Sequence, residues 1–368
     1  MKVLLVSPYS EKMVGGIINW TKYIIDYHRE NGGDVDLTLL YNENASQVMD
    51  TSTPFARFRV GICNYIPVVR QFKEKVSSEH FDVAHICTSA SFGLIRDLLV
   101  ARAAKRRGVK VVAHMHFGRI PQVLKSNGWE STLLFRLFKK VDYVVVMDQA
   151  SFDVLRAYGL RNVKYVPNPL SEEVQRVIDE CRNIQEDQRK IIFAGHVLPT
   201  KGVEELVMAC SQIDNIKLKL LGKIPDESYQ EHLFTIAGKE SEKWLSIPGN
   251  QPFDAVIAEM KSCGMFVLPS YFEGFPNVIL ESMACGTPIV ATSVGAIPEM
   301  LAVESDKPCG VCCEPMNVDA LRRSIQFLLD NPQEAKEYGN RAKKRVREMY
   351  LMPIIWKQLV AVWRDVTK

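Results

Sequence analysis

The sequence lacks any hydrophobic run long enough to cross a membrane. A transmembrane helix needs about 18 or more consecutive apolar residues, and no stretch of the 368 residues approaches that length. The first residues, MKVLLVSPYS, hold only a short apolar run before Pro8, which indicates a buried strand rather than a secretory signal peptide. The sequence therefore predicts a cytoplasmic protein without a membrane span.

The sequence also lacks a strong charge of either sign. It has 46 Lys and Arg against 43 Asp and Glu, a formal net charge of +3. The one dense basic cluster, Lys105-Arg106-Arg107, stands before Gly108 and is typical of a helix end. A nucleic-acid partner is therefore not expected.

Cysteine is present but not in the patterns of disulfide-rich or zinc-binding proteins. Nine cysteines lie at scattered spacings with no export signal, which indicates reduced thiols. Cys309, Cys312 and Cys313 lack the second cysteine pair or the histidines that zinc needs. We expect this cluster to form a short buried strand, 310–314, and expect no metal.

Apolar runs and amphipathic stretches alternate along the chain, which is typical of parallel, doubly wound α/β sheets. The predicted strands are residues 3–6, 36–41, 82–86, 109–115, 141–147, 163–166, 191–195, 216–221, 265–268 and 289–291. A single amphipathic helix is predicted over 124–140. The polar stretch 171–190 separates two domains, 1–170 and 171–350, and a final helix occupies 351–368.

The stretch LPSYFEGFPNVILESMACGTPIVATSVGAIPEM, residues 268–300, carries the clearest chemistry. It predicts a strand, a loop with Gly274 as its flexible point, a helix capped by Asn277, and a second strand. Glu273 lies in the loop and Glu281 in the helix, at the end of a strand where open α/β sheets bind ligands. The helix N-terminus suits a phosphate and the carboxylates suit sugar hydroxyls. The alternative is that both glutamates are solvated surface charges.

This stretch resembles the donor-site signature of the retaining GT-B glycosyltransferases of the large glycosyltransferase family 4, the group 1 glycosyl transferases. The matching residues are Pro269-Ser270, Glu273-Gly274-Phe275-Pro276, Glu281, Ala284, Gly286, Pro288, Val290, Gly295 and Pro298-Glu299. The resemblance implies two Rossmann-like domains facing across a cleft. The first shapes the acceptor site, the second holds the sugar nucleotide, and the last helix crosses back onto the first.

The resemblance also implies roles for individual residues of the second half. Glu281 is expected to bind ribose hydroxyls, and Glu273 to act as a catalytic residue that binds the donor sugar. Lys201 and His196 are expected on the diphosphate, and the donor site is completed by Gly274, Phe275, Pro276 and Asn277. His196 stands where the family has arginine, so one imidazole donor replaces a charged fork of five. If protonated His196 contacts the phosphate, donor binding should tighten as the pH falls from about 8 to about 6.

In the first half the resemblance implies two further site residues. Gly16 belongs to a glycine pair at a strand-to-helix turn, where backbone N–H groups can approach an anion, although most such pairs are simple turns. His114 and His116 are two apart at a strand end, so both face one way. His116 is predicted as the catalytic residue near the donor sugar, with His114 as the second choice. A metal held by both lacks a nearby third ligand.

Together these features predict a retaining transferase that moves a sugar from a nucleotide-diphosphate sugar to a saccharide or lipid-linked saccharide acceptor. The resemblance places it in cell-surface polysaccharide synthesis, with neither cofactor nor metal, and no Asp-x-Asp pair is expected to serve the diphosphate. One alternative is a sugar-nucleotide epimerase of the same two-domain build. Another is a non-catalytic nucleotide-sugar binding protein, which His196 in place of arginine makes conceivable.

Two segments of the first half mix basic and apolar residues, Phe55–Lys75 and Leu124–Lys140. Basic residues beside aromatic ones favour contact with an anionic membrane surface. The sequence therefore predicts peripheral association with the inner face of the membrane. The alternative is that the aromatic residues are core and the cations are simply solvated.

Overall fold

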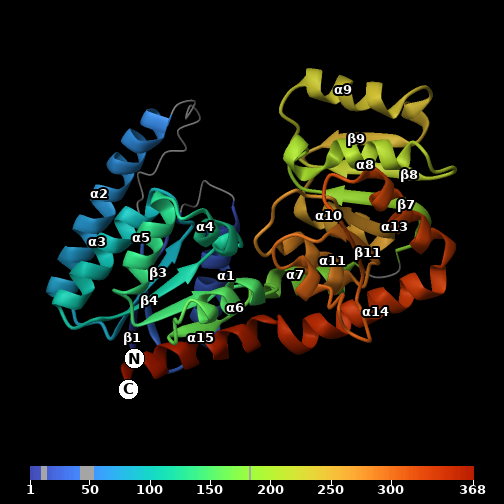
Figure 1. Ribbon diagram of the computed structural model, residues 1–368. Coiled ribbons are helices and arrows are strands. Elements are labelled where there is room, and N and C mark those ends of the chain that lie inside the picture. The colour runs from blue at the N-terminus through green and yellow to red at the C-terminus, as the bar shows by residue number, and fades with distance from the viewer. Residues whose placement is uncertain (10–14, 42–53, 182–183) are drawn as a thin grey trace. The chain divides into compact units, whose positions relative to one another are not determined.

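The computed structural model describes residues 1–9, 15–41, 54–181 and 184–368, and for 54–64 it describes the backbone only. The chain divides into two compact units. One is Met1–Pro169 together with Met352–Lys368, and the other is Leu170–Leu351. Each unit contains a six-stranded parallel sheet with helices packed around it (Figure 1). The predicted doubly wound α/β architecture is therefore confirmed for both halves of the chain.

The first sheet has the strand order β2-β1-β3-β4-β5-β6. Its strands are β1 (Lys2–Val6), β2 (Asp36–Leu40), β3 (Val83–Thr88), β4 (Lys110–Met115), β5 (Tyr143–Val146) and β6 (Val163–Tyr165). Its helices are α1 (Gly16–Asn31), α2 (Pro54–Ser78), α3 (Gly93–Arg106), α4 (Ile120–Ser126), α5 (Trp129–Phe138), α6 (Gln149–Ala157) and α15 (Met352–Thr367). The chain runs outward from β1 to β2 and then returns to the other side of β1 as β3. The topological switch point, where such sheets bind ligands, thus lies between β1 and β3.

Alternate residues of each strand in the first sheet enter two different layers of core. On β1, Leu4 and Val6 pack on the side of α2, α3 and α5. Val3 and Leu5 pack on the opposite side, with Trp20 of α1 and apolar residues of α15. Figure 1 shows α15 lying along this first unit. Because the strands are covered on both faces, they are continuous apolar runs in the sequence.

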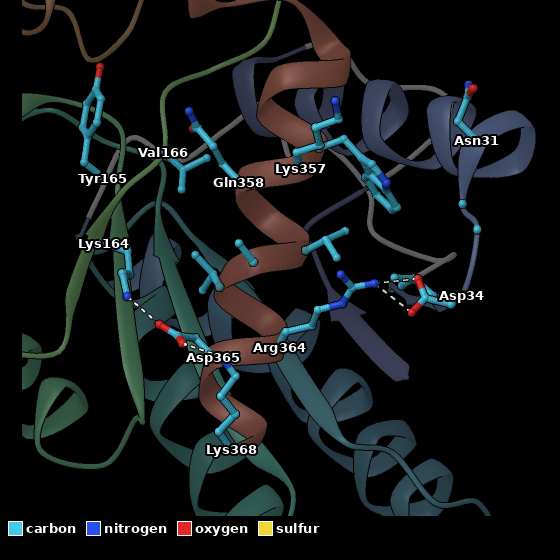
Figure 2. A pocket seen from close by; sticks show the side chains of 17 residues that line it. Asn31, Asp34, Lys164, Tyr165, Val166, Lys357, Gln358, Arg364, Asp365 and Lys368 are labelled. Atoms are coloured by element: carbon cyan, nitrogen blue, oxygen red, sulfur yellow. Dashed lines mark hydrogen bonds and ion pairs between the residues drawn. The ribbon is translucent and has the colours of Figure 1, made fainter.

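Two ion pairs flank α15 on opposite sides (Figure 2). Arg364 reaches Asp34 at 2.8 Å, and Asp365 reaches Lys164 at 2.8 Å. Both pairs are exposed, so they contribute little stability. Directly before these two residues, Trp363 is fully buried in the core. Apolar packing therefore holds α15, and the ion pairs help set how it is rotated against the sheet.

The second sheet has the order β12-β11-β10-β7-β8-β9. Its strands are β7 (Asp187–Ala194), β8 (Lys217–Leu221), β9 (Leu245–Gly249), β10 (Cys263–Leu268), β11 (Ile289–Thr292) and β12 (Val311–Cys313). Its helices are α7 (Glu172–Glu180), α8 (Val203–Cys210), α9 (Glu227–Ala237), α10 (Phe253–Ser262), α11 (Asn277–Cys285), α12 (Ile297–Met300), α13 (Val318–Asp330) and α14 (Pro332–Met349), with short 3₁₀ turns η1 (Pro199–Lys201) and η2 (Ser241–Lys243). Here the switch point lies between β7 and β10.

Two local predictions differ from the structure, and the structure adds a helix in the stretch 171–190. The stretch 124–140 is not one helix, because Asn127 adopts a left-handed conformation (φ 48°) and separates α4 from α5. Ser126-Asn127-Gly128 are turn-forming residues, so the break was visible in the sequence. Asn277 does not cap α11: Pro276 holds the cap position and Asn277 is the first helical residue. The polar stretch 171–190 contains α7, which begins where Ser171 Oγ accepts a hydrogen bond from the Val174 N–H.

Other expectations concern membranes, thiols and metals. None of the helices in the described ranges is long and apolar enough to cross a membrane. The predicted short strand at 310–314 is β12, and every described cysteine is a free thiol. Within the same ranges, no group of three or more His, Cys, Asp or Glu residues is placed to hold a metal ion.

Candidate active site

The polar residues predicted from the second half gather at the carboxyl ends of β7 and β10. These strands are hydrogen-bonded neighbours and form the switch point of the sheet. His196 follows β7, Lys201 ends η1, and the loop 269–276 follows β10. Residues far apart in the sequence therefore meet at the edge where ligands of such sheets bind.

Backbone packing brings the Lys201 turn against the end of β10. Gly202 has a φ of 68°, and a Cβ at this position would lie 2.1 Å from the carbonyl oxygen of Pro269. Only glycine permits that approach. Beside it, the Tyr271 N–H donates to the Thr200 carbonyl at 3.0 Å. The position of Lys201 is thus determined by two segments that touch backbone to backbone.

The loop that follows β11 closes the other side of the site. Gly295 has a φ of 57°, and a Cβ there would lie 2.3 Å from the carbonyl oxygen of Glu273. The Ala296 N–H donates to the Gly274 carbonyl at 2.8 Å. The turn before α12 therefore contacts the backbone of both Glu273 and Gly274 and fixes the position of their loop.

This packing sets Lys201 and Glu273 against each other. Lys201 Nζ donates to Glu273 Oε1 at 2.6 Å, and their side chains are 29% and 12% exposed. A charge-assisted hydrogen bond of this length is strong, and it is partly shielded from water. The sequence predicted both residues in the site, but it did not predict that they pair.

Glu281 lies on α11, one turn after Asn277 and partly buried. Burial raises the pKa of its carboxyl to about 7. No hydrogen bond or ion pair from the described residues offsets that desolvation. A buried carboxylate without a partner is costly unless something else supplies hydrogen bonds, so a ligand with hydroxyl groups would complete this environment.

The other predicted residues of the second unit play different parts. His196 is exposed directly after Gly195, which has a φ of 150°. Its ring is therefore open to solvent at the same end of the sheet. Phe275 is buried and its ring contacts that of Tyr350, with the centroids 5.7 Å apart. Phe275 and the buried Pro276 thus shape the loop from inside, while His196 faces outward.

In the first unit, His116 follows β4 and is partly exposed. Its ring lies 4.1 Å from that of His114 and 4.7 Å from that of Trp20, centroid to centroid. Burial lowers the pKa of His116 to about 3, so the ring is neutral at physiological pH. Gly16 begins α1 one turn before Trp20, and a Cβ there would meet nothing within 4 Å. No packing with described residues therefore requires glycine at position 16.

Two residues beside His114 were not identified from the sequence. His85 on β3 is fully buried, with its Nε2 3.3 Å from His114 Nδ1. Trp363 on α15 donates from its indole N–H to His85 Nδ1 at 3.0 Å. His85 lies in a predicted strand, but nothing in the sequence indicates which strands are neighbours or where the last helix packs.

Two protein-family models match this chain. "Glycosyltransferase Family 4" matches residues 14–174, and "Glycosyl transferases group 1" matches residues 174–345. An uncharacterized glycosyltransferase of Methanocaldococcus jannaschii is 26% identical over 94% of this chain and 93% of its own length. The capsular polysaccharide biosynthesis glycosyltransferase CapM of Staphylococcus aureus is 25% identical over 55% of this chain and 50% of its own length.

The fold is also similar to that of solved structures. The Anabaena protein HepE, in complex with UDP, superposes with a TM-score of 0.73 at 17% identity, covering 99% of this chain and 100% of that protein. At this identity the likeness concerns the fold alone. The sequence signature, the two consecutive family models and the paired six-stranded sheets agree with one another. The chain is a group 1, family 4 glycosyltransferase with the GT-B fold, a member of a retaining family that uses nucleotide sugars.

Proposed function

We propose that this enzyme moves a sugar from a nucleotide-diphosphate sugar to a saccharide or lipid-linked saccharide acceptor in the synthesis of cell-surface polysaccharide. The donor part of this proposal rests on the Lys201–Glu273 pair at the switch point of the second sheet. It rests also on Glu281, which has no partner among the described residues and lies on α11, the helix that follows the Glu273 loop. The relative CapM, named for capsular polysaccharide biosynthesis, supports the acceptor part.

The donor would lie across the carboxyl ends of β7 and β10. Its diphosphate faces Lys201, His196 and the N-terminus of α11, where the helix dipole is positive. Glu281 accepts hydrogen bonds from the ribose hydroxyls, and Glu273 from hydroxyls of the transferred sugar. When the diphosphate binds, Lys201 is shared between the phosphate oxygens and Glu273.

For this family of retaining enzymes, we propose the following transfer step. The bond between the anomeric carbon and the phosphate oxygen breaks, and the acceptor oxygen bonds to that carbon on the same face. Negative charge grows on the leaving diphosphate, and the Lys201 cation stabilises it in a site partly shielded from water. The leaving phosphate takes the acceptor proton, so no separate base is required. In the first unit, we propose that neutral His116 and the backbone at Gly16 make hydrogen bonds to the ligand.

Binding of nucleotides to a Glu281→Ala variant tests the donor assignment. We expect nucleotides and sugar nucleotides to raise the melting temperature of the native enzyme, and UDP is the first ligand to test. A ligand at one hundred times its dissociation constant adds about 2.7 kcal/mol. Glu281→Ala should weaken nucleotide binding measured by calorimetry, whereas the exposed Glu337→Ala on α14 should not. Unchanged affinity in Glu281→Ala would contradict the ribose role.

Product analysis tests the reaction itself. With a donor and a saccharide acceptor, we expect a new glycoside whose anomeric configuration matches that of the donor. Reactions without acceptor should leave the donor intact except for slow hydrolysis. An isomerised sugar nucleotide formed without acceptor would instead indicate an epimerase, and tight nucleotide binding without any turnover would indicate a binding protein.

Peripheral membrane contact through the first unit belongs to the same proposal, and one surface supports it. Between α2 and α3 lies a largely apolar hollow of about 570 Å³. Its rim exposes Ile66, Ile95 and Leu99. The cations Arg70 and Lys73 also line it, and Arg70 pairs with Glu74 at 2.9 Å. Apolar groups flanked by cations suit an anionic bilayer surface. The residues Phe55, Arg57, Phe58, Arg59 and Ile62, on which the sequence prediction also drew, lie outside the described side chains.

The second segment, 124–140, offers less to a membrane than its sequence suggests. Leu124, Leu134, Leu137 and Phe138 are all buried in the core. Trp129 remains 53% exposed, stacked on Phe92. We therefore expect co-sedimentation with anionic vesicles at low salt to fall when Ile66 and Lys73 are replaced by Ser. Neutralising Lys125, Arg136, Lys139 and Lys140 should have the smaller effect. Absence of binding to anionic vesicles at low salt would contradict the membrane contact.

A further inference from the structure

A hydrogen-bonded network joins the loops at the carboxyl ends of β3 and β4, beside His116. The His116 N–H donates to the Thr88 carbonyl at 2.8 Å. The Thr88 hydroxyl in turn accepts from the Ala90 N–H at 3.1 Å. The next residue, Ser91, donates from its N–H to Glu130 Oε1 at 2.7 Å. These bonds place the first turn of α5 at the same edge of the sheet as His116.

The loop after β3 is held in a strained conformation. Ala90 and Ser91 have φ values of 67° and 52°, a region that residues with a Cβ rarely adopt. Such strain persists only where surrounding contacts hold it, and it occurs often at functional sites. Here the two residues turn the chain so that Phe92, which follows them, stacks on Trp129. The strained turn thus fixes an aromatic pair at the strand ends.

Trp129 presents a fixed and open aromatic face. It is 53% exposed, although it begins α5 and the next residue, Glu130, is bonded to the loop. Its ring and that of Phe92 have centroids 5.1 Å apart and planes that differ by 19°. Because Phe92 covers one face of the indole, most of the exposed surface belongs to the other face. An electron-rich ring face of this kind attracts the polarised C–H groups of a sugar ring.

The same turn carries a matched pair of charges, Arg119 and Glu130. Arg119 Nη1 and Nη2 donate to the two oxygens of Glu130 at 2.7 and 2.6 Å. Burial opposes the charge of Glu130, but hydrogen bonds from Arg119 and Ser91 outweigh it and lower the pKa of this carboxyl. The pair is therefore ionised and carries no net charge. Arg119 also donates to Ser91 Oγ at 3.3 Å, so two of its five guanidinium N–H groups are left without a partner among the described residues.

These features suit a neutral sugar better than an anion or a lipid chain. A phosphate would compete with Glu130 for the same guanidinium, and the carboxylate would repel it. A lipid chain would pack on Trp129 but would not use the N–H groups of Arg119. A pyranose ring has an apolar face for the indole and hydroxyls that accept from Arg119. A charge-neutral polar pair near an open aromatic face therefore favours a ring with hydroxyl groups.

We propose that Trp129 and Arg119 form a subsite of the first unit that binds a neutral sugar ring of the acceptor. The sugar ring stacks on the open face of Trp129, and its hydroxyls accept hydrogen bonds from Arg119. Glu130 is a positioning residue, because it orients the guanidinium and holds the Ser91 turn. The inference deepens the proposed function, and it rests on that function only for the identity of the sugar as an acceptor.

The indole N–H signals of the full-length protein test sugar binding without any donor. The five tryptophans give five such signals in a ¹H–¹⁵N spectrum, and Trp129→Phe identifies the signal of Trp129. The probes are the methyl α- and β-glycosides of glucose, galactose, mannose and N-acetylglucosamine, with inorganic phosphate as the comparison. We expect at least one glycoside to shift the Trp129 signal and phosphate to leave it unchanged. A shift with phosphate alone, or no shift with any glycoside, would overturn the proposal.

This readout also separates the inference from the proposed function. Sugar binding at Trp129 without any transfer of sugar would contradict the proposed function and support the subsite. Transfer of sugar by a protein whose Trp129 signal ignores every glycoside would do the reverse.

Replacement of the aromatic residue tests the stacking. In Trp129→Ala we expect KM for the acceptor to rise about 2- to 10-fold, the range for one aromatic contact, with kcat and KM for the donor nearly unchanged. Tyr158→Ala is the matched control, because Tyr158 lies in the same unit, is 51% exposed and packs on Phe135. Equal acceptor KM values for the two variants would contradict the stacking. Loss of binding to anionic vesicles in Trp129→Ala, with acceptor KM unchanged, would assign Trp129 to the membrane instead.

The charge of Glu130 provides a test that a purely structural role would not affect. Glu130→Gln keeps an oxygen for the Ser91 N–H but leaves the Arg119 charge without its counterpart. The native protein should prefer the hexoside that binds best over its uronic acid counterpart, and the Gln variant should shift this preference several-fold toward the uronic acid. Glu130→Asp keeps the charge and should keep the native preference. A native preference for the uronic acid, or the same preference in the Gln variant as in the native protein, would overturn the assignment to a neutral sugar.

Discussion

The two units of this enzyme share one architecture but carry different chemistry at their strand ends. In the second unit, the switch point between β7 and β10 holds a charged pair, Lys201 and Glu273, and a partly buried carboxyl, Glu281. In the first unit, the groups at the end of β4 are His114 and His116, and burial lowers the pKa of both. The second unit is therefore equipped for a charged ligand, and the first for neutral hydrogen bonding.

The two switch points also differ in what holds the surrounding loops in place. In the second unit, glycines with positive φ, such as Gly202 and Gly295, let neighbouring loops touch. In the first unit, non-glycine residues after β3 adopt positive φ: Ala90 at 67° and Ser91 at 52°. Side chains hold them there, since the Ser91 N–H donates to Glu130 at 2.7 Å. In the second unit, the loops around the charged pair can touch because glycine has no Cβ. In the first unit, specific hydrogen bonds hold a strained turn.

Gly202→Ala should have the largest effect, because it breaks the backbone contact between η1 and the end of β10. The added Cβ lies 2.1 Å from the Pro269 carbonyl at a φ of 68°. We expect a loss of roughly 2–4 kcal/mol in the free energy of unfolding, together with loss of nucleotide binding. Denaturant unfolding measures the loss of stability. Gly249→Ala, with a φ of 76° in open space, reports the backbone cost alone. Equal losses in the two variants would show that the contact with Pro269 does not matter.

Lys201→Ala tests whether the charge of the second unit serves the ligand. It removes the cation that we propose for the diphosphate and leaves Glu273, 12% exposed, without its partner. We expect nucleotide affinity to fall about 10- to 100-fold, the range for one charge-assisted hydrogen bond. Lys217→Ala is the matched control, because Lys217 also pairs with a carboxylate, Asp187, but in an exposed pair at the start of β7 and β8. Calorimetry with UDP should distinguish them, and similar affinities would argue against the diphosphate role.

Glu281→Gln should stabilise the ligand-free enzyme while weakening nucleotide binding. Burial raises the pKa of Glu281 from 4.5 to about 7, so the folded state favours the protonated carboxyl. Stability is then highest at low pH and falls as the pH rises from about 4.5 to 7, where the unfolded chain has already ionised. The amide cannot ionise, so the variant should gain about 1–3 kcal/mol at pH 8 and little at pH 4. Urea unfolding at both pH values measures this, and a pH-independent difference would exclude the explanation.

The smallest expected effect is on how nucleotide affinity changes with pH. Nucleotide binding should tighten as the pH falls from about 8 to 6 if protonated His196 meets the diphosphate. Ionised Glu281 favours the opposite trend, because only the carboxylate accepts from both ribose hydroxyls. A nucleoside without phosphates isolates the Glu281 trend, and His196→Arg removes the His196 trend from nucleotide binding. Changes of a few fold are expected, and identical profiles for the nucleoside and the nucleotide would exclude His196 from the phosphate.

Much of the second unit was predictable from the sequence because its site is local. Residues 268–300 contain a strand, a loop, a helix and both glutamates in one continuous stretch, so their spacing reports the site directly. The helix cap was predicted wrongly at Asn277, since Pro276, with no N–H to donate, takes the cap position just before it. An error of one residue at a helix end does not change the helix face on which Glu281 lies.

The first unit was harder to predict because its polar cluster is not local. Alternation along one strand places His114 and His116 on the same face, and the sequence contains that information. The sequence does not contain the neighbour relation that brings His85 from β3 beside His114, nor the docking of Trp363, 278 residues from His85. Those contacts depend on sheet order and on the packing of α15.

The sequence by itself determined the family, the alternation of strands and helices, and the residues proposed for the nucleotide sugar, because periodic burial and short-range motifs are local features of the chain. Only the tertiary structure decided that Lys201 pairs with Glu273, that Glu281 has no described partner, and that Trp363 donates a hydrogen bond to His85. The physical reason is that a hydrogen bond or a pKa depends on distances of a few ångströms between atoms. Strand order and helix packing set those distances, and no single stretch of sequence specifies them.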